Sequence, residues 1–284
     1  MELQADRIRV IVYDLDGTVY DDTRHFEIYS RLIQEQLPPD VREVFWQDYA
    51  ATVAGHHPAL AIGCFYDRER DLVLRLKGGK VARVLRWDGA EVDAAQWREW
   101  YPGVVEPDHQ RIMNVGDLWW VPTAVSAHYG GISDRHHQCF LRMREIMADE
   151  SFDIRPIPGF RDLVLALKGK AIQVLATNSP QPDSEAILTK VGLRGLLDGH
   201  YFQSNKPVGL KRILAELAGI YGCGMDAILS IGDNLVNEIT PARALGCQTV
   251  FIDPHGLGDA DDADLVVRDM AELMPRLRGM FMVK

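Results

Sequence analysis

The chain has 284 residues, of which 47% are hydrophobic and 25% are charged, a balance that is ordinary for folded globular proteins and excludes a disordered or fibrous chain. Its formal net charge of -10 argues against a nucleic acid polymer as partner, because such binding depends on clustered Lys and Arg that neutralise phosphates. We therefore expect the partner to be a small molecule.

The cysteines and the N-terminus indicate the cellular compartment. The four cysteines are far apart in the sequence, and the N-terminus has no apolar run long enough for a secretory signal. No stretch has the length and apolar character of a membrane span. We therefore expect a cytoplasmic protein with reduced thiols and no membrane partner. No pattern in the sequence indicates an oligomeric state.

A buried strand is the first predicted element. Residues Ile8 to Tyr13 form a short, β-branched and nearly continuous apolar run, which is typical of a strand buried on both faces of a parallel sheet. From about residue 158, apolar runs alternate with helical patterns, and this order predicts a parallel sheet with helices on both faces. The runs that predict strands are Ala171 to Ala176, Ile228 to Ile231 and Thr249 to Ile252, and the helical patterns cover Phe160 to Leu167 and Leu210 to Leu217.

The segment from 21 to 157 breaks this alternation. Residues 71 to 92 largely alternate or are β-branched, which predicts strands, with hairpin-type turns at Gly78-Gly79 and Asp88-Gly89. We therefore expect an inserted mixed α/β domain at 21–157, within an α/β core made of 1–20 and 158–284. Helical spacing of apolar residues is found in three stretches of the insert, Phe26 to Ile33, Val41 to Tyr49 and Phe140 to Met147.

Two aspartates follow the first predicted strand. Asp14 and Asp16 lie in the sequence Asp-Leu-Asp-Gly-Thr, at the strand end where parallel α/β sheets place their ligands. Two carboxylates at this spacing can face one cleft, so that one attacks a phosphorus atom and the other transfers protons. The alternative is a purely structural turn with Thr18, because Asp, Gly and Thr are common turn formers.

Polar residues follow two further predicted strand ends. Thr177 and Asn178 come after the strand that ends at Ala176, and Lys206 follows a short predicted strand at Tyr201 to Ser204. Hydroxyl, amide and ammonium donors suit phosphoryl oxygens and the charge of a nucleophile. The alternatives are ordinary turn or capping chemistry for Thr177 and Asn178, and a solvated surface position for Lys206.

A third carboxylate follows the predicted strand Ile228 to Ile231. Asp233 comes directly after Gly232, and Glu238 lies at the start of the next predicted helix. Mg²⁺ prefers oxygen ligands with few carboxylates, so Asp14, Asp233 and Glu238 are candidate ligands of one ion. The alternative for Glu238 is a favourable charge at a helix N-terminus.

These motifs, in this order, resemble those of the haloacid dehalogenase-like (HAD) hydrolase superfamily. Its D-x-D-G-T motif is matched by Asp14 to Thr18, its Ser/Thr motif by Thr177 and its lysine motif by Lys206. The fourth motif, G-D-x-x-x-N-D, is matched by Gly232 to Glu238, with a glutamate where an aspartate is usual. The resemblance covers about half of the chain, namely the predicted core.

The resemblance implies a Rossmann-like core, Mg²⁺ as cofactor and a small phosphorylated substrate. It implies Asp14 as the nucleophile, Asp16 as the acid/base and Lys206 as the neutralising cation. The large insert after the first strand resembles a type-one cap domain. The residues implied for phosphate binding are Thr18, Thr177 and Asn178, and those for the metal are Asp14, Asp16 through its backbone carbonyl, Asp233 and Glu238.

A phosphatase for a small phosphorylated metabolite is the leading function. Tyr20, two residues after Thr18, also resembles the start of pyrimidine nucleotidase-like members, so a 5'-nucleotidase is an alternative. A phosphomutase shares all four motifs and is another. True dehalogenases of the superfamily lack the second aspartate, so Asp16 argues against carbon–halogen cleavage. A non-catalytic binding protein on this fold would be expected to lose at least one of four motif residues, and all four are present: Asp14, Asp16, Lys206 and Asp233.

Overall fold

The computed structural model describes residues 3–108, 110–258 and 261–282, so the predicted domain residues 1–2, 109, 259–260 and 283–284 lie outside the described part. The chain divides into two compact units, which are Met1–Asp22 with Arg144–Lys284, and Thr23–Met143. Residues 144–157, which the sequence assigns to the insert, group with the first unit. None of the helices in the described part combines the length and the apolar character that a membrane crossing needs.

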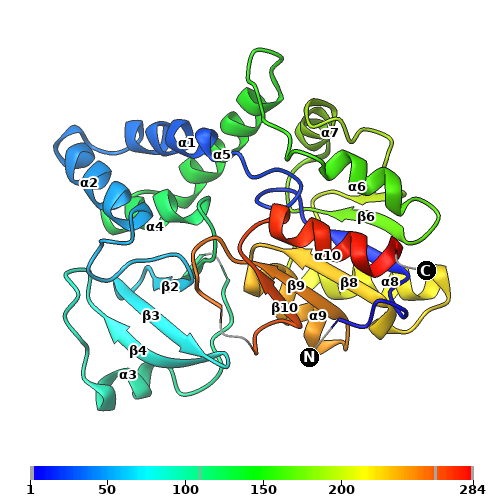
Figure 1. The fold of residues 1–284 in the computed structure, drawn as a ribbon. Helices are drawn as coiled ribbons and strands as arrows, with labels where there is room; N and C mark the ends of the chain where they lie inside the picture. The colour runs from blue at the N-terminus through cyan, green and yellow to red at the C-terminus, as the bar shows by residue number, and fades with distance from the viewer. Residues whose placement is uncertain (1–2, 109, 259–260, 283–284) are drawn as a thin grey trace. The chain divides into compact units, whose positions relative to one another are not determined.

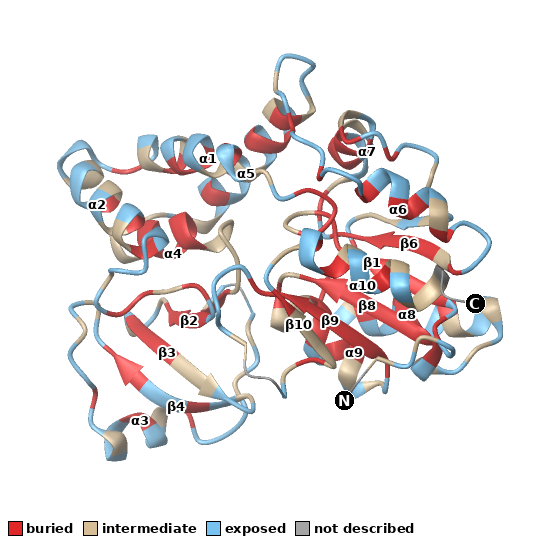
Figure 2. Cartoon of the chain, in the orientation of Figure 1, coloured by how far each residue is buried: buried red, intermediate tan, exposed pale blue. Residues whose placement is uncertain are grey.

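The first unit is built on a six-stranded sheet in which all neighbouring strands are parallel (Figure 1). The strand order is β10-β9-β8-β1-β6-β7, so the first strand of the chain lies in the middle of the sheet. Figure 2 shows β1, β8 and β9 as almost wholly buried. The strands are β1 (Val10–Tyr13), β6 (Ile172–Ala176), β7 (Gly199–Tyr201), β8 (Ile228–Gly232), β9 (Gln248–Ile252) and β10 (Leu265–Val267).

Helices cover both faces of this sheet. Val10 and Val12 of β1 pack in one apolar cluster with the buried side of α8, while Tyr13 packs edge-on against Phe160 of α6, with ring centroids 5.7 Å apart. Successive strand residues point to opposite faces, so the Rossmann-like core with helices on both faces is confirmed. The helical elements are α6 (Phe160–Leu167), α7 (Gln181–Lys190), α8 (Val208–Tyr221), η2 (Met225–Ala227), η3 (Leu235–Ile239), α9 (Thr240–Ala244) and α10 (Met270–Met282).

The second unit combines helices with an antiparallel sheet of order β4-β3-β2-β5. Gly78 and Gly79 both have positive φ and join β3 to β4, as the two-residue hairpin turn requires. The predicted inserted mixed α/β domain is therefore confirmed as part of the fold. Its elements are α1 (Arg24–Glu35), η1 (Pro39–Val41), α2 (Arg42–Val53), β2 (Cys64–Asp67), β3 (Leu72–Lys77), β4 (Lys80–Leu85), α3 (Ala94–Trp100), β5 (Ile112–Val115), α4 (Trp120–His128) and the first part of α5 (Ser133–Ala148).

A buried histidine is expected to make the stability of the insert depend on pH. His136 on α5 lies 2.8 Å, through Nε2, from Ser126 Oγ on α4, and burial, helped by the charge of Arg68, lowers the pKa of His136 to about 4. Because the unfolded chain then binds more protons than the folded protein, stability falls as the pH drops below the ordinary histidine pKa of about 6.5 and levels off below about 4.

We expect His136→Gln to remove this pH dependence, because glutamine can still bond to Ser126 but does not titrate. Between about pH 7.5 and about pH 5, the wild type should lose about 2 kcal/mol of unfolding free energy more than the variant. Urea unfolding of both proteins at the two pH values measures the difference. Parallel losses in the two proteins would show that His136 is not the responsible group.

Candidate active site

The loop after β1 places two aspartates and a sharp turn at the carboxyl edge of the core sheet. Asp14 still belongs to the sheet through its backbone, because its N–H donates to the carbonyl of Ile231 on β8 at 3.0 Å. Its side chain is almost fully buried. Thr18 is wholly buried, and its Oγ1 has no hydrogen-bond partner within the described residues. The structure therefore brings Asp14 beside the neighbouring strand end.

Lys206 joins two of the predicted carboxylates. Its Nζ lies 2.5 Å from Asp14 Oδ1 and 2.6 Å from Glu238 Oε1, and all three side chains are buried. Burial lowers the pKa of Lys206, but attraction to Asp14 and Glu238 outweighs this effect and the pKa rises. The lysine is therefore a fixed cation in contact with both carboxylates, and the alternative of a solvated surface lysine is wrong.

The loop of Lys206 is held by the side chain of Asn178. The Asn178 Oδ1 accepts from the Lys206 backbone N–H at 2.7 Å, and its Nδ2 donates to the Lys206 carbonyl at 3.3 Å. Thr177, also predicted to bind phosphate, is buried, and its Oγ1 accepts from the N–H of Ser179 at 3.1 Å. The side-chain amide of Asn178 thus positions the lysine loop, and phosphate binding by either residue stays a prediction.

Three carboxylates form a cluster that suits a divalent cation. Ligand oxygens of Asp14, Asp233 and Glu238 all lie within 4.8 Å of one another. Oxygen donors with this charge fit Mg²⁺, so the residues present match the metal that the sequence predicts. Glu238 also accepts from the Asn234 N–H through Oε2 at 3.0 Å, in addition to its contact with Lys206.

The buried surroundings raise the pKa of Asp14. Desolvation is the largest cause, the charge of Lys206 opposes it, and the neighbouring carboxylate of Asp16 adds to the rise. A nucleophile must be ionised to attack, so a further positive charge beside Asp14 would favour the reactive form. The acidic cluster around Asp14 is a place for such a charge.

Two glycines make room for this cluster. Gly17 has φ of +75°, and a Cβ there would lie 2.1 Å from Asp233 Oδ2. At Gly232, a Cβ would lie 2.4 Å from Glu238 Cγ. The close approach of the β1 loop to Asp233, and of Glu238 to the end of β8, therefore depends on residues without a side chain.

We expect Gly17→Ala to lower the specificity constant kcat/KM by about 100-fold or more, because the new methyl group displaces Asp233 from the cluster. Gly169→Ala is a matched control, since Gly169 has the same φ of +75° but no atom within 4 Å of a Cβ. Both variants carry the backbone strain of a left-handed residue, and only Gly17→Ala also crowds Asp233. Steady-state kinetics at saturating Mg²⁺, with thermal unfolding as a fold check, compares them. Equal activity in the two variants would contradict the expectation.

Asp16 is surrounded by hydrogen-bond donors. Its Oδ1 accepts from the Tyr20 hydroxyl and from Arg144 Nη1, the latter at 2.6 Å, and its Oδ2 accepts from Ser179 Oγ at 3.2 Å. Arg144 Nε also donates to Asp183. Neither Arg144 nor Asp183 was predicted from the sequence as a site residue. One signal was present, because Arg144 interrupts the apolar helical stripe formed by Phe140, Met143 and Met147.

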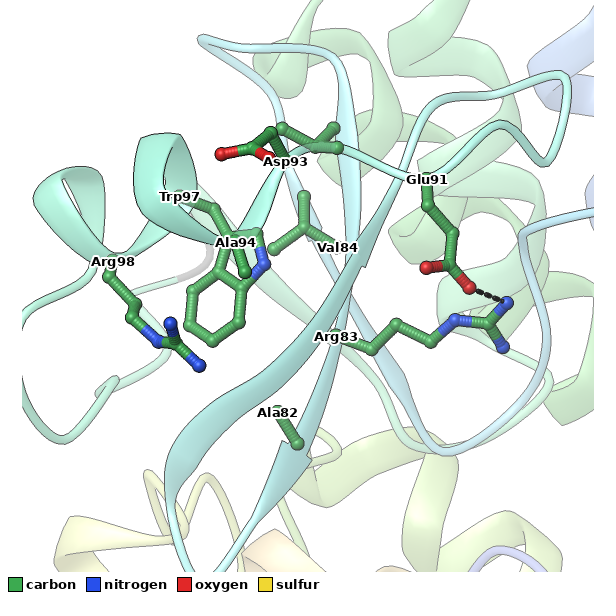
Figure 3. Close-up of a pocket in the computed structure, with 9 residues that line it drawn as sticks. Ala82, Arg83, Val84, Glu91, Asp93, Ala94, Trp97 and Arg98 are labelled. Carbon is green, nitrogen blue, oxygen red and sulfur yellow. Dashed lines mark ion pairs between the residues drawn. The ribbon is translucent and has the colours of Figure 1, made fainter.

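The insert has a pocket of its own, with a volume of about 490 Å³, between β4 and α3 (Figure 3). Trp97 and Arg98 of α3 line one side, and Arg83 of β4 forms an ion pair with Glu91 on the other. None of the predicted catalytic, phosphate-binding or metal-binding residues lines this pocket. This pocket therefore contains none of the chemistry that the sequence predicts.

A comparison with protein-family models supports the predicted family resemblance. A family model for haloacid dehalogenase-like hydrolases matches residues 8–246. The chain belongs to this family. The HAD-like family resemblance that the sequence predicted is thus confirmed, and the protein is a hydrolase of that family.

Solved structures show the same fold. A magnesium-bound putative HAD-hydrolase, YfnB from Bacillus subtilis, is 15% identical with a TM-score of 0.54, over 95% of this chain and 99% of that one. A predicted phosphoglycolate phosphatase from Haemophilus somnus is 17% identical with a TM-score of 0.52, over 95% and 98%. No curated protein matches this sequence. At these identities the likeness supports the fold alone.

Proposed function

We propose that this HAD-like hydrolase is a Mg²⁺-dependent phosphatase that cleaves a small phosphomonoester through an aspartyl-phosphate on Asp14. The observation that carries the proposal is the buried contact of Lys206 with Asp14 and Glu238, beside the third carboxylate, Asp233. A buried nucleophile, a fixed cation and an acidic metal cluster at one strand edge suit the transfer of a charged phosphoryl group.

The metal would be held by Asp14, Asp233 and the backbone carbonyl of Asp16, with Glu238 acting through water because its oxygens already contact Lys206 and the Asn234 N–H. A bound Mg²⁺ supplies charge neutralisation for the phosphoryl oxygens. The magnesium in the Bacillus subtilis structure belongs to that protein, and it supports the choice of ion here by family membership only.

In the proposed reaction, the Asp14 carboxylate attacks phosphorus and the phosphate–oxygen bond to the leaving group breaks. Asp16 enters the first step protonated and gives this proton to the leaving oxygen. In the second step the Asp16 carboxylate accepts a proton from the water that attacks the aspartyl-phosphate, which releases inorganic phosphate and restores Asp14. Lys206 stays protonated and offsets charge on Asp14 and the phosphoryl group. Thr18, Thr177 and backbone N–H groups near Asn178 are proposed to contact the phosphoryl oxygens.

Asp16 separates this proposal from carbon–halogen cleavage. Halide leaves as a stable anion and needs no proton, whereas an alkoxide leaving from phosphate does. A carboxylate that retains 15% of its side-chain exposure beside the buried Asp14 is suited to that proton transfer. We therefore propose phosphomonoesters, including nucleoside monophosphates, as the substrate class.

Phosphate release from a panel of sugar phosphates, nucleoside monophosphates and small phosphoacids tests the proposal, with Mg²⁺ and after its removal by EDTA. We expect release from at least one member with Mg²⁺ and almost none without it. Conversion of a sugar phosphate into an isomer without free phosphate would instead identify a phosphomutase. Halide release from a haloacid, with no phosphate release from any compound, would refute the proposal.

A further inference from the structure

The carboxylate of Asp16 is held from several parts of the core unit. Donors reach it from Tyr20, which follows the β1 loop, from Ser179 after β6 and from Arg144 on α5. Both carboxylate oxygens are engaged, because Oδ1 accepts from Tyr20 and Arg144 while Oδ2 accepts from Ser179. Such contacts hold the plane of the carboxylate, and not only its position.

Arg144 is itself fixed between two carboxylates. Its Nη1 donates to Asp16 and its Nε donates to Asp183, at the start of α7. The arginine side chain is 2% exposed, whereas that of Asp16 is 15% exposed. Arg144 is therefore screened from solvent, whereas part of the Asp16 side chain remains accessible.

Stability alone does not explain a buried arginine at this position. Removing charges from water is unfavourable, and an apolar group of similar volume often stabilises a core equally well. The planar guanidinium instead offers donors in a fixed fork, which can hold one carboxylate relative to another. Asp183 therefore fixes the guanidinium group of Arg144, and the guanidinium group fixes the carboxylate of Asp16.

We propose that Arg144, anchored by Asp183 and assisted by the Tyr20 hydroxyl, is a positioning residue that orients the Asp16 carboxylate for proton transfer to the leaving oxygen. This inference rests on the proposed phosphatase function. A proton donor must lie within hydrogen-bond reach of the atom that receives the proton. Loosening the carboxylate should therefore affect only reactions in which the leaving oxygen needs that proton.

The dependence on the leaving group supplies a readout that a merely structural role would not change. An alkyl phosphate releases a strongly basic oxygen that needs a proton, while p-nitrophenyl phosphate releases a stabilised phenolate that needs little help. The value of kcat/KM reports the steps up to departure of the leaving group. Its ratio between the best alkyl phosphate of the panel and p-nitrophenyl phosphate thus measures proton donation.

The variants are Tyr20→Phe, Arg144→Lys and Asp183→Asn, with Asp16→Asn as the reference for complete loss of the donor. Tyr13→Phe is the matched control, because Tyr13 is also a fully buried tyrosine of the core, and its hydroxyl donates to Gln173 instead. Tyr20→Phe keeps nearly the same volume and so preserves the fold if the larger changes at Arg144 do not. Thermal unfolding of each variant checks this.

We expect Tyr20→Phe and Arg144→Lys to lower kcat/KM for the alkyl phosphate about tenfold or more, with a change of about threefold or less for p-nitrophenyl phosphate. Asp183→Asn should shift the ratio in the same direction, and Tyr13→Phe should leave it unchanged.

If Asp16→Asn shifts the ratio but neither Tyr20→Phe nor Arg144→Lys does, the positioning role is wrong and the proposed function stands. Equal losses of kcat/KM on both substrates would likewise show that Tyr20 and Arg144 have only a structural role. If Asp16→Asn itself leaves the ratio unchanged, or the wild type releases phosphate from neither compound, the proposed role of Asp16 fails and this inference fails with it.

Discussion

Replacing Asp14 with asparagine should reduce phosphate release by about 10³-fold or more, the scale of loss seen when an enzyme loses its nucleophile. Asparagine keeps the shape of the side chain but cannot form a stable acyl-phosphate. The folded state should tolerate the change, because Lys206 keeps its second carboxylate, Glu238, at 2.6 Å. The measurement is steady-state phosphate release on the best substrate of the panel.

Rapid acid quenching of the enzyme during turnover gives a second measurement of the same prediction. The wild type should carry the added mass of one phosphoryl group on the peptide that contains Asp14, and Asp14→Asn should not. Asp226→Asn is the control, since Asp226 is an exposed aspartate that precedes β8 and pairs with Arg7. Turnover of Asp14→Asn at the wild-type rate would exclude this aspartate as the nucleophile.

The core of the fold was predictable because its central strands are mostly apolar and rich in β-branched residues. Val10–Tyr13, Ile228–Gly232 and Gln248–Ile252 are buried at every position, so their sequences are mostly apolar, without the alternation of a half-exposed strand. The short strands were not predicted in place. Gly199–Tyr201 at the sheet edge has no fully buried residue, and the predicted strand at Tyr201 to Ser204 lies too late in the chain.

The sheet of the insert was only partly predictable. The hairpin of β3 and β4 was expected from its glycine turn, but β2 was missed. Its last residue, Asp67, is fully buried, which breaks the apolar pattern of a strand. The carboxylate accepts from the N–H of Glu69 at 3.0 Å, which is a local contact, and from the Tyr101 hydroxyl at 2.6 Å, which is 34 residues away. A distant partner such as Tyr101 has no local signal in the sequence.

The contrast between local sequence signals and distant contacts also applies to the candidate site. Asp14, Lys206 and Asp233 were predictable as neighbours because each follows a core strand, and parallel strands end at one edge. Arg144 comes from a helix 128 residues after Asp16, so nothing near either residue predicted their contact. A charged residue inside an apolar helical stripe is nevertheless a usable signal, since an arginine is rarely buried without a partner.

Replacing Lys206 with methionine should destabilise the protein by about 3–5 kcal/mol in the absence of metal, the usual result of removing one partner of a buried ion pair. Asp14 and Glu238 would then share a buried site without their cation. Activity should also fall by about 100-fold or more, because the charge of the transferring phosphoryl group loses a fixed counter-charge. Lys211→Met is the matched control, since Lys211 is an exposed residue of α8.

The destabilisation of Lys206→Met should depend on pH in a defined direction. Burial already raises the pKa of Asp14 and Lys206 opposes that rise, so loss of the lysine raises the pKa further. A carboxyl with a raised pKa binds more protons in the folded protein than in the unfolded chain, and its folded state therefore gains stability as the pH falls. Urea unfolding in EDTA should show a larger deficit relative to the wild type at about pH 8 than at about pH 5. A deficit that is equal at both pH values, or one matched by Lys211→Met, would mean that the lysine does not compensate a buried carboxylate.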